Sequence, residues 1–289
     1  MQTVTLGRTG RTVSRLVLGG FPLGGVNRAR GWDPWSAAGR RTAVATINHA
    51  LDRGITYIDT APSYGDGNSE TLIGEVMRHR RHECLLATKV NWEGASAADV
   101  IGSVEASLRR LQTDHVDLVQ IHGGVYRAED ARFIAGGPLD GLRTMRADGK
   151  LRHIGITVEE PWTARPLLAE TDVEVVQLAY NLIYQQAARR FLDEATEAGV
   201  GLVTMRTMTS GIFQRAAGLL APEWQGAHDL YDACLKFVLA DSRIHAPIVG
   251  MRWPDEVDRN VDLVESFHPD FDLAELPRLT AGIYAAEDA

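Results

Sequence analysis

Short apolar runs alternate with segments of helical periodicity about eight times along the chain. The clearest helical segment begins at Ser96 and Asp99, a pair typical of a capping box, and repeats apolar residues at helical spacing as far as Leu111. The remaining runs are short and mostly apolar, which predicts short buried strands. We predict strands at Leu16–Gly20, Ile55–Asp59, Glu83–Lys89, Val116–Ile121, Leu151–Thr157, Val173–Leu178, Gly201–Met205 and Ala246–Val249.

Helices are expected between these strands, and successive right-handed strand–helix–strand units close most naturally into a barrel. A (β/α)8 barrel needs roughly 250 residues as a single unit, so the sequence predicts one barrel domain over residues 1–289. Two short extended segments, Thr3–Leu6 and Thr12–Arg15, flank the sequence GRTG and predict a β-hairpin ahead of the barrel. Further helices are predicted around Val44–Leu51, from Asn68 to Val76, and at Leu139–Ala147, Phe191–Ala198, Leu230–Leu239 and Asp255–Ser266.

Composition narrows the classes of partner. Hydrophobic residues make up 45% of the chain and charged residues 24%, which are globular values. A formal net charge of −8 argues against a nucleic-acid partner, because nucleic-acid-binding proteins usually display a basic face. Two cysteines are too few for a disulfide framework, and no segment resembles a signal peptide or a membrane span. We therefore expect a cytoplasmic protein without a membrane partner.

Ionisable side chains follow three neighbouring predicted strands. Asp59 ends the run ITYID and Tyr64 follows it, Lys89 ends CLLATK, and His122 follows VDLVQI. In a closed parallel barrel the carboxyl ends of the strands face one rim, so these four side chains are predicted to converge there. Such an arrangement suits acid–base chemistry, because a lysine ammonium lowers the pKa of a nearby phenol and a carboxylate keeps that lysine charged.

The sequence Asp59-Thr60-Ala61-Pro62-Ser63-Tyr64-Gly65 resembles the signature of the aldo-keto reductases, and Lys89 and His122 fall where that family places them. The resemblance runs from VTLGRTG-RTVSRLVLGG to IVGMRWPDEVDRNV and includes GKLRHIGIT and VVQLAYN. It implies a hairpin that closes the bottom of the barrel and hydride transfer between a nicotinamide and a carbonyl or sugar carbon. Tyr64 is then the proton donor, and His122 positions the substrate carbonyl.

The same resemblance implies several nicotinamide contacts. Gln177 and Asn181 in VVQLAYN match positions near the carboxamide, with Gln177 the firmer assignment. Thr157 stands where the family often has Ser followed by Asn, but here Val158 follows. Arg206 replaces an aromatic residue that often stacks on the nicotinamide, so we expect it to stack or to meet a phosphate.

The late run GMRWPDEVDRN bears on the choice of nucleotide, with Gly250, Met251, Arg252 and Asn260 as expected contacts. Gly250 and Glu256 stand where many relatives carry a Lys and an Arg for the 2′-phosphate of NADPH. Arg252 is expected to supply that charge instead. Glu256 would repel a phosphate, so NADPH is the expected cofactor and NADH use stays open.

Aromatic residues on the loops at the predicted catalytic rim are candidates for the substrate pocket, although such residues also pack on one another. The glycine pair after His122 suggests extra room for a substrate. The candidates are Phe21, Trp32, Trp92 and Tyr126.

Other functions remain open at this point. Singly, each side chain has a structural interpretation: Asp59 as a cap, Lys89 as a snorkelling side chain, Tyr64 as an interface aromatic, and His122 as a satisfied buried imidazole. A nucleotide-binding sensor subunit, or a redox-neutral lyase or epimerase that recycles its cofactor, would keep the same four residues. Ser63 lacks a nucleophile elbow, and the histidines and cysteines lack metal-ligand spacing, so no metal is expected.

Overall fold

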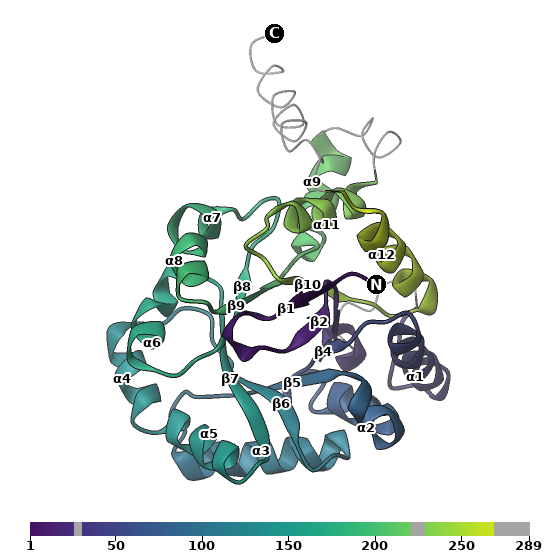
Figure 1. Cartoon of the computed structure of the whole chain (residues 1–289). Helices are drawn as coiled ribbons and strands as arrows, with labels where there is room; N and C mark the ends of the chain where they lie inside the picture. The colour runs from purple at the N-terminus through teal and green to yellow at the C-terminus, as the bar shows by residue number, and fades with distance from the viewer. Residues whose placement is uncertain (26–30, 221–228, 269–289) are drawn as a thin grey trace.

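The apolar runs pair in parallel and close on themselves in a computed structural model of the chain, which describes residues 1–25, 31–220 and 229–268. Eight strands form a closed barrel in the order β10-β3-β4-β5-β6-β7-β8-β9 (Figure 1). The predicted (β/α)8 fold is therefore confirmed. The strands are β3 (Val17–Gly19), β4 (Tyr57–Asp59), β5 (Leu85–Val90), β6 (Val116–Ile121), β7 (Leu151–Val158), β8 (Val175–Ala179), β9 (Gly201–Met205) and β10 (Ala246–Gly250).

Helices surround the barrel on its outer side (Figure 1). The expected ones are α1 (Ala37–Asp52), α2 (Asn68–Arg80), α3 (Ala97–Leu111), α5 (Pro138–Ala147), α8 (Leu192–Glu197), α11 (Leu230–Ala240) and α12 (Pro254–Ser266). The helix predicted at Phe191–Ala198 begins one residue later, because Phe191 has φ −147° and separates it from α7 (Gln186–Arg190). Sequence periodicity missed α4 (Ala128–Ala135), α6 (Arg165–Glu170) and α9 (Ile212–Leu220), which have at most nine residues and give little periodic signal.

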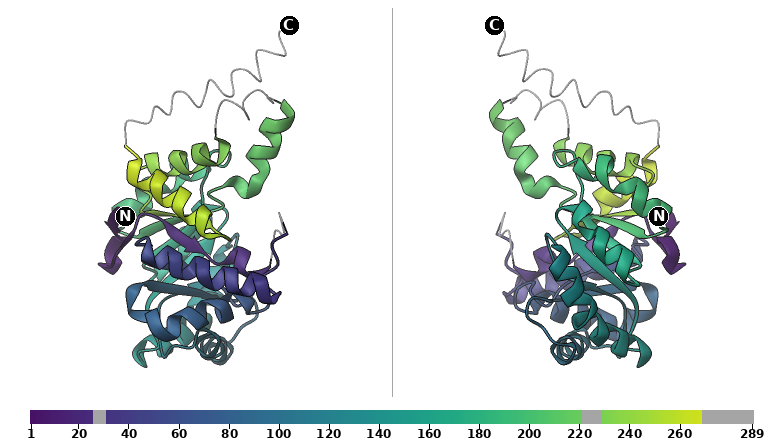
Figure 2. Two further views of the ribbon diagram at one scale, coloured as in Figure 1. Left: turned by 90° about the vertical axis from the view of Figure 1, so that its right-hand side faces the viewer. Right: turned by 90° about the vertical axis from the view of Figure 1, so that its left-hand side faces the viewer.

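The predicted hairpin is present, with β1 (Thr3–Thr5) antiparallel to β2 (Thr12–Ser14). Its connection contains a 3-10 turn, Gly7–Thr9, so it is longer than the tight turn that GRTG suggested. Leu6 is fully buried within the barrel interior, where it packs with side chains of several strands. Figure 2 shows the hairpin and α9 at opposite ends of the molecule, so the hairpin closes the end of the barrel from which the strands start.

Two apolar layers fill the molecule, because strands such as β5 and β6 are buried on both faces. One layer lies between the strands and the helices, and the other fills the barrel interior. The interior layer comprises Leu6, Val13, Val17, Tyr57, Leu85, Ala87, Leu118, Val175, Val203 and Ala246. Polar side chains follow it toward the carboxyl ends of the same strands, where Asp59, Lys89 and Gln120 are buried.

A buried carboxylate joins β6 to its surroundings near the hairpin end. Asp117 accepts hydrogen bonds from Arg81 at 2.6 Å, from the backbone N–H of Leu86 at 3.0 Å and from Arg152 at 3.0 Å.

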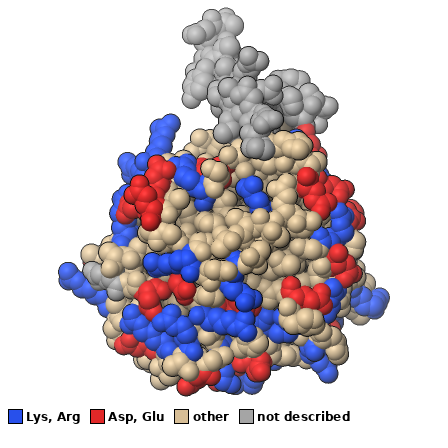
Figure 3. Space-filling model, viewed as in Figure 1, with Lys and Arg blue, Asp and Glu red and all other residues tan. Residues whose placement is uncertain are grey.

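On the hairpin face, basic side chains lie beside acidic ones around an uncharged centre (Figure 3). Within residues 1–25, 31–220 and 229–268, no helix is both long and apolar enough to cross a membrane.

We predict that Asp117→Ala lowers the free energy of unfolding by about 3 kcal/mol, because it leaves the buried N–H of Leu86 without its acceptor and removes the carboxylate that pairs with Arg81. Arg152→Ala is the matched control and should cost less than about 1 kcal/mol, since that partner is half exposed. Urea unfolding of both variants measures the two values. Equal losses would show that the carboxylate is not the anchor of this end of the barrel.

Candidate active site

The ends of β4 and β5 place a buried ion pair inside the barrel. Lys89 Nζ lies 2.7 Å from Asp59 Oδ2 and donates a second hydrogen bond of 2.8 Å to the carbonyl of Thr60. Lys89 is 0% exposed and Asp59 2% exposed. Moving two charges out of water costs several kcal/mol each, so the short contact and the extra acceptor are needed to keep the pair stable.

Tyr64 lies on the loop after β4, and the backbone fixes its position. Its N–H donates to the carbonyl of Ala61 at 3.1 Å, and its carbonyl accepts from Ser69 at 3.2 Å. The turn Phe21–Gly24 packs against this loop so closely that a Cβ on Gly24 would lie 2.5 Å from the carbonyl carbon of Tyr64. This contact requires a glycine at position 24, which therefore serves the packing of Tyr64.

The four predicted catalytic side chains lie together. Lys89 Nζ is 4.9 Å from the centroid of the Tyr64 ring. The Tyr64 and His122 rings are 6.2 Å apart, nearly perpendicular at 79°. Phe21, which is 46% exposed, meets Tyr64 edge to face at 5.1 Å. The side chains therefore form one cluster at the carboxyl ends of β4, β5 and β6.

Burial and the neighbouring charges together set the protonation states of the cluster. Burial raises the pKa of Tyr64, the Lys89 charge lowers it, and burial prevails, so this pKa lies above the ordinary value. The Lys89 charge thus acts on the phenol in the predicted direction, but burial, whose extent the sequence alone does not reveal, outweighs it. For Lys89, burial lowers the pKa, but Asp59 and Tyr64 together raise it above the ordinary value. Near neutral pH Tyr64 is thus protonated and Lys89 charged.

His122 follows β6, and its backbone N–H donates to the carbonyl of Val90 at 2.8 Å. Burial and then the charge of Lys89 lower the pKa of His122 to about 4. The imidazole is therefore neutral at physiological pH, where it has one N–H donor and one acceptor nitrogen. This agrees with a positioning role that does not depend on its titration.

One polar residue of this cluster was not predicted. Gln120 on β6 is fully buried, and its Nε2 donates to Asp59 Oδ1 at 2.9 Å. Gln120 lies beside Lys89 in the register of β5 and β6. The sequence did contain one signal, a carboxamide inside the apolar run VDLVQI. It stands two residues before His122, a spacing that places both side chains on the same face of a strand.

The proposed nicotinamide contacts fall into two groups. Gln177 on β8 is 2% exposed, and its Oε1 has no hydrogen-bond partner among the described residues. Thr157 on β7 instead uses its hydroxyl within the protein, donating to the carbonyl of Gly123 at 2.9 Å and accepting from the Gly123 N–H at 3.0 Å. Asn181 likewise accepts from the N–H groups of Ile183 and Tyr184. Gln177 is therefore the member of this set with a buried acceptor left for an amide ligand.

Arg206 follows β9 and adopts a left-handed backbone conformation with φ +57°. Its guanidinium donates to Glu159 Oε1 at 3.0 and 2.7 Å. Asn181 Nδ2 also donates to the Arg206 carbonyl at 3.1 Å. In this structure the guanidinium therefore ties the loop after β9 to the loop after β7, which the sequence did not suggest.

The segment before α12 is organised around Glu256. One carboxylate oxygen of Glu256 accepts from the backbone N–H of Arg252 at 2.6 Å, and its carbonyl accepts from Asn260 Nδ2 at 2.6 Å. Met251 is fully buried, whereas Gly250 at the end of β10 is exposed. The negative charge of Glu256 therefore lies at the start of α12, beside Arg252.

The aromatic candidates for the substrate pocket differ in exposure. Phe21 is exposed beside Tyr64, whereas the other three are buried. Trp32 donates to the carbonyl of Pro22 at 2.8 Å, and Trp92 packs against Tyr126 with ring centroids 5.8 Å apart. Tyr126 donates to the carbonyl of Thr157 at 2.9 Å and lies where a Cβ on Gly123 would be. The space that the glycine pair suggested is thus filled at Gly123 by the phenol of Tyr126.

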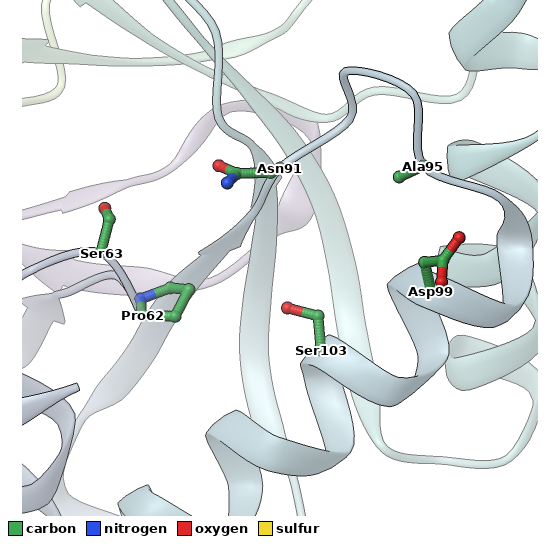
Figure 4. A pocket seen from close by; sticks show the side chains of 6 residues that line it. All are labelled: Pro62, Ser63, Asn91, Ala95, Asp99 and Ser103. Atoms are coloured by element: carbon green, nitrogen blue, oxygen red, sulfur yellow. The ribbon is translucent and has the colours of Figure 1, made fainter. Parts of the chain in front are cut away.

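A surface pocket lies beside the Tyr64 loop. Figure 4 shows the loop after β4 on one side of it and α3 on the other, with Asn91 between them. Asp99 already accepts from the N–H and hydroxyl of Ser96, so its carboxylate serves to cap α3. The lining residues are Pro62, Ser63, Asn91, Ala95, Asp99 and Ser103.

Both cysteines, Cys84 and Cys234, are buried and free. In the described ranges, no group of three or more His, Cys, Asp or Glu side chains is arranged to hold a metal ion.

Comparison with known proteins agrees with this geometry. A sequence model of the Aldo/keto reductase family matches residues 15–279. The chain therefore belongs to the Aldo/keto reductase family, whose members are oxidoreductases, and the predicted resemblance is confirmed.

Particular relatives extend along most of the chain. It is 28% identical to a pyridoxal 4-dehydrogenase of Microbacterium luteolum, over 92% of this chain and 93% of the relative. An aldo-keto reductase of Bacillus halodurans, solved in its holo form, has a TM-score of 0.77 at 25% identity and covers 92% of each chain. One from Klebsiella pneumoniae, solved in complex with NADPH, has a TM-score of 0.78 at 23% identity, over 96% of this chain and 94% of that one.

We predict that His122 makes folding sensitive to mild acid. Its pKa is about 4 in the folded protein and near ~6.5 in an unfolded chain, so the folded state binds fewer protons between these values. The stability is fully present above the unfolded pKa and is lost as pH falls toward about 4.

Chemical unfolding at pH 7 and pH 4.5 should therefore show a larger stability loss for wild type than for His122→Asn. His79→Asn, which removes an exposed imidazole of α2, is the control and should behave as wild type. An equal loss in wild type and His122→Asn would refute the low pKa.

Proposed function

We propose that this protein is an NADP(H)-dependent oxidoreductase that reduces an aldehyde or ketone, or oxidises the corresponding alcohol or sugar. The observation that carries the proposal is the buried Lys89 ammonium, held by Asp59 at 2.7 Å and lying 4.9 Å from the centroid of the Tyr64 ring. A phenol beside a fixed cation is suited to proton transfer, because the cation stabilises the phenolate that transfer leaves behind.

Each residue of the cluster has a distinct role in this proposal. Tyr64 holds its proton near neutral pH and gives it to the oxygen of the carbonyl as that oxygen gains negative charge. Lys89 stabilises the resulting phenolate, and Asp59 keeps Lys89 in place. The neutral His122 imidazole donates a hydrogen bond to the same carbonyl oxygen and orients it.

A nicotinamide nucleotide, when bound, supplies or accepts the hydride. The buried, unpartnered Oε1 of Gln177 fits this group, since a carboxamide N–H is the donor that this acceptor lacks among the described residues. Thr157 and Asn181 would support it indirectly, because they hold the loops beside it. The dehydrogenase name of the Microbacterium relative supports including the oxidation direction in the proposal.

We predict that Tyr64→Phe lowers kcat about 10²- to 10⁴-fold, the usual contribution of a general acid, with nucleotide binding retained. The measurement is the nicotinamide absorbance change over a panel of aldehydes, ketones and free sugars, with NADPH and NADH tested separately. Turnover by the variant at the wild-type rate would refute the role of Tyr64. Tight nucleotide binding by wild type without any turnover would favour a sensor or a redox-neutral enzyme.

Nucleotide choice is expected to depend on the segment before α12. Arg252 would attract the 2′-phosphate of NADPH, whereas the adjacent Glu256 carboxylate would repel it. We therefore propose that NADPH is bound with modest selectivity and that NADH is also used.

Arg252→Ala should raise the KM for NADPH about tenfold, which corresponds to about 1.4 kcal/mol of binding, and should leave the KM for NADH nearly unchanged. Glu256→Gln should lower the KM for NADPH and not that for NADH. Steady-state kinetics with each nucleotide tests both. An unchanged NADPH constant in Arg252→Ala would rule out the arginine as the phosphate contact.

A further inference from the structure

We propose that Gln120 is a positioning residue that fixes the rotation of the Asp59 carboxylate, and through it the place of the Lys89 ammonium beside Tyr64. The inference rests on the proposed function for its kinetic consequences. Its structural basis is independent of the substrate and of the nucleotide.

The two oxygens of Asp59 have different partners. Oδ2 accepts from Lys89 Nζ at 2.7 Å, and Oδ1 accepts from Gln120 Nε2 at 2.9 Å. Among the described residues, no other hydrogen bond reaches Oδ1. With both ends held by neighbouring strands, the carboxylate cannot turn about its side-chain bond without breaking a buried hydrogen bond to a charged group, which costs about 1.5 to 3 kcal/mol.

The surroundings of Gln120 permit one orientation. Its Nε2 points at the Asp59 carboxylate. If the amide were turned over, Oε1 would face Asp59 Oδ1, and two acceptors would lie against each other. Oε1 is left without a partner among the described residues, a cost that the bond to Asp59 offsets. Gly155 on β7 leaves room for the side chain, since a Cβ there would lie 3.0 Å from Gln120 Cγ.

The charge of Asp59 raises the pKa of Tyr64, and that of Lys89 lowers it. Loss of the Gln120 N–H would leave more of the Asp59 charge uncompensated and would let Asp59 draw Lys89 away from the phenol. Both changes hold the proton on Tyr64 more tightly. Gln120 therefore acts on Tyr64 through two other side chains and without touching it.

Two variants test this in the full-length protein. Gln120→Leu removes the donor and should lower kcat about tenfold, with the dissociation constant for NADPH unchanged. Gln120→Glu keeps the shape and can donate only when its carboxyl is protonated. Two adjacent carboxyls cannot easily both ionise, so this variant should be active near pH 5.5 and lose activity as pH rises. The wild-type pH profile should lack this descending limb.

The matched control is Gln214→Leu, which removes another buried carboxamide, one that bonds Thr209, and should show wild-type kcat and pH dependence. Wild-type kcat in Gln120→Leu would overturn the proposal. So would an equal, pH-independent loss in Gln120→Leu and Gln120→Glu, since that pattern marks a purely structural role. If Gln120→Leu does not fold, the pH profile of Gln120→Glu decides.

A readout without turnover separates this proposal from the proposed function. Tyrosinate absorbance, taken as the difference between each protein and its Tyr64→Phe counterpart, follows the ionisation of Tyr64 alone. Gln120→Leu should move that ionisation to higher pH even if no substrate is ever turned over. An unmoved titration would overturn the role of Gln120 and leave the proposed function untouched.

Discussion

The arrangement at the carboxyl ends of the strands depends on keeping one ammonium charged where water does not reach. Lys89 is stable there because Asp59 and the carbonyl of Thr60 replace its hydration. That requirement explains why β4 and β5 must be neighbours with Asp59 and Lys89 at their ends. It also explains the carboxamide on β6, since the carboxylate has a second oxygen to satisfy. The barrel supplies these partners from three adjacent strands.

Tyr64 is held in a different way from the ion pair. No strand carries it, and its loop is fixed by backbone hydrogen bonds and by the close contact with Gly24. The phenol is thus partly buried against Lys89 and Phe21 while its loop faces the rim. In the proposed reaction, the Tyr64 hydroxyl would then face a ligand while the Lys89 ammonium stays in the interior.

Much of this was readable from the sequence, because strand ends are marked by the change from an apolar run to an ionisable residue. Asp59, Lys89 and His122 each follow such a run, and the order of strands in a parallel barrel brings them together. The pKa of Tyr64 was not readable, since burial depends on atoms from several segments. Nor was the burial of Tyr126, which fills space beside Gly123 from three residues away. Gln120 was missed because its one signal, the spacing of two residues from His122, does not distinguish it from a tolerated polar residue in a strand.

The hairpin has a consequence for how protons travel. Leu6 and Val13 are buried among the strand side chains that fill the interior below Asp59. Among the described residues, the barrel interior on the hairpin side is therefore filled by apolar side chains. If Tyr64 donates a proton as proposed, that proton would then be restored from the rim, past the loops that a substrate would cross. Under the proposed function, proton resupply and ligand exchange would use the same end of the barrel, so each would have to wait for the other.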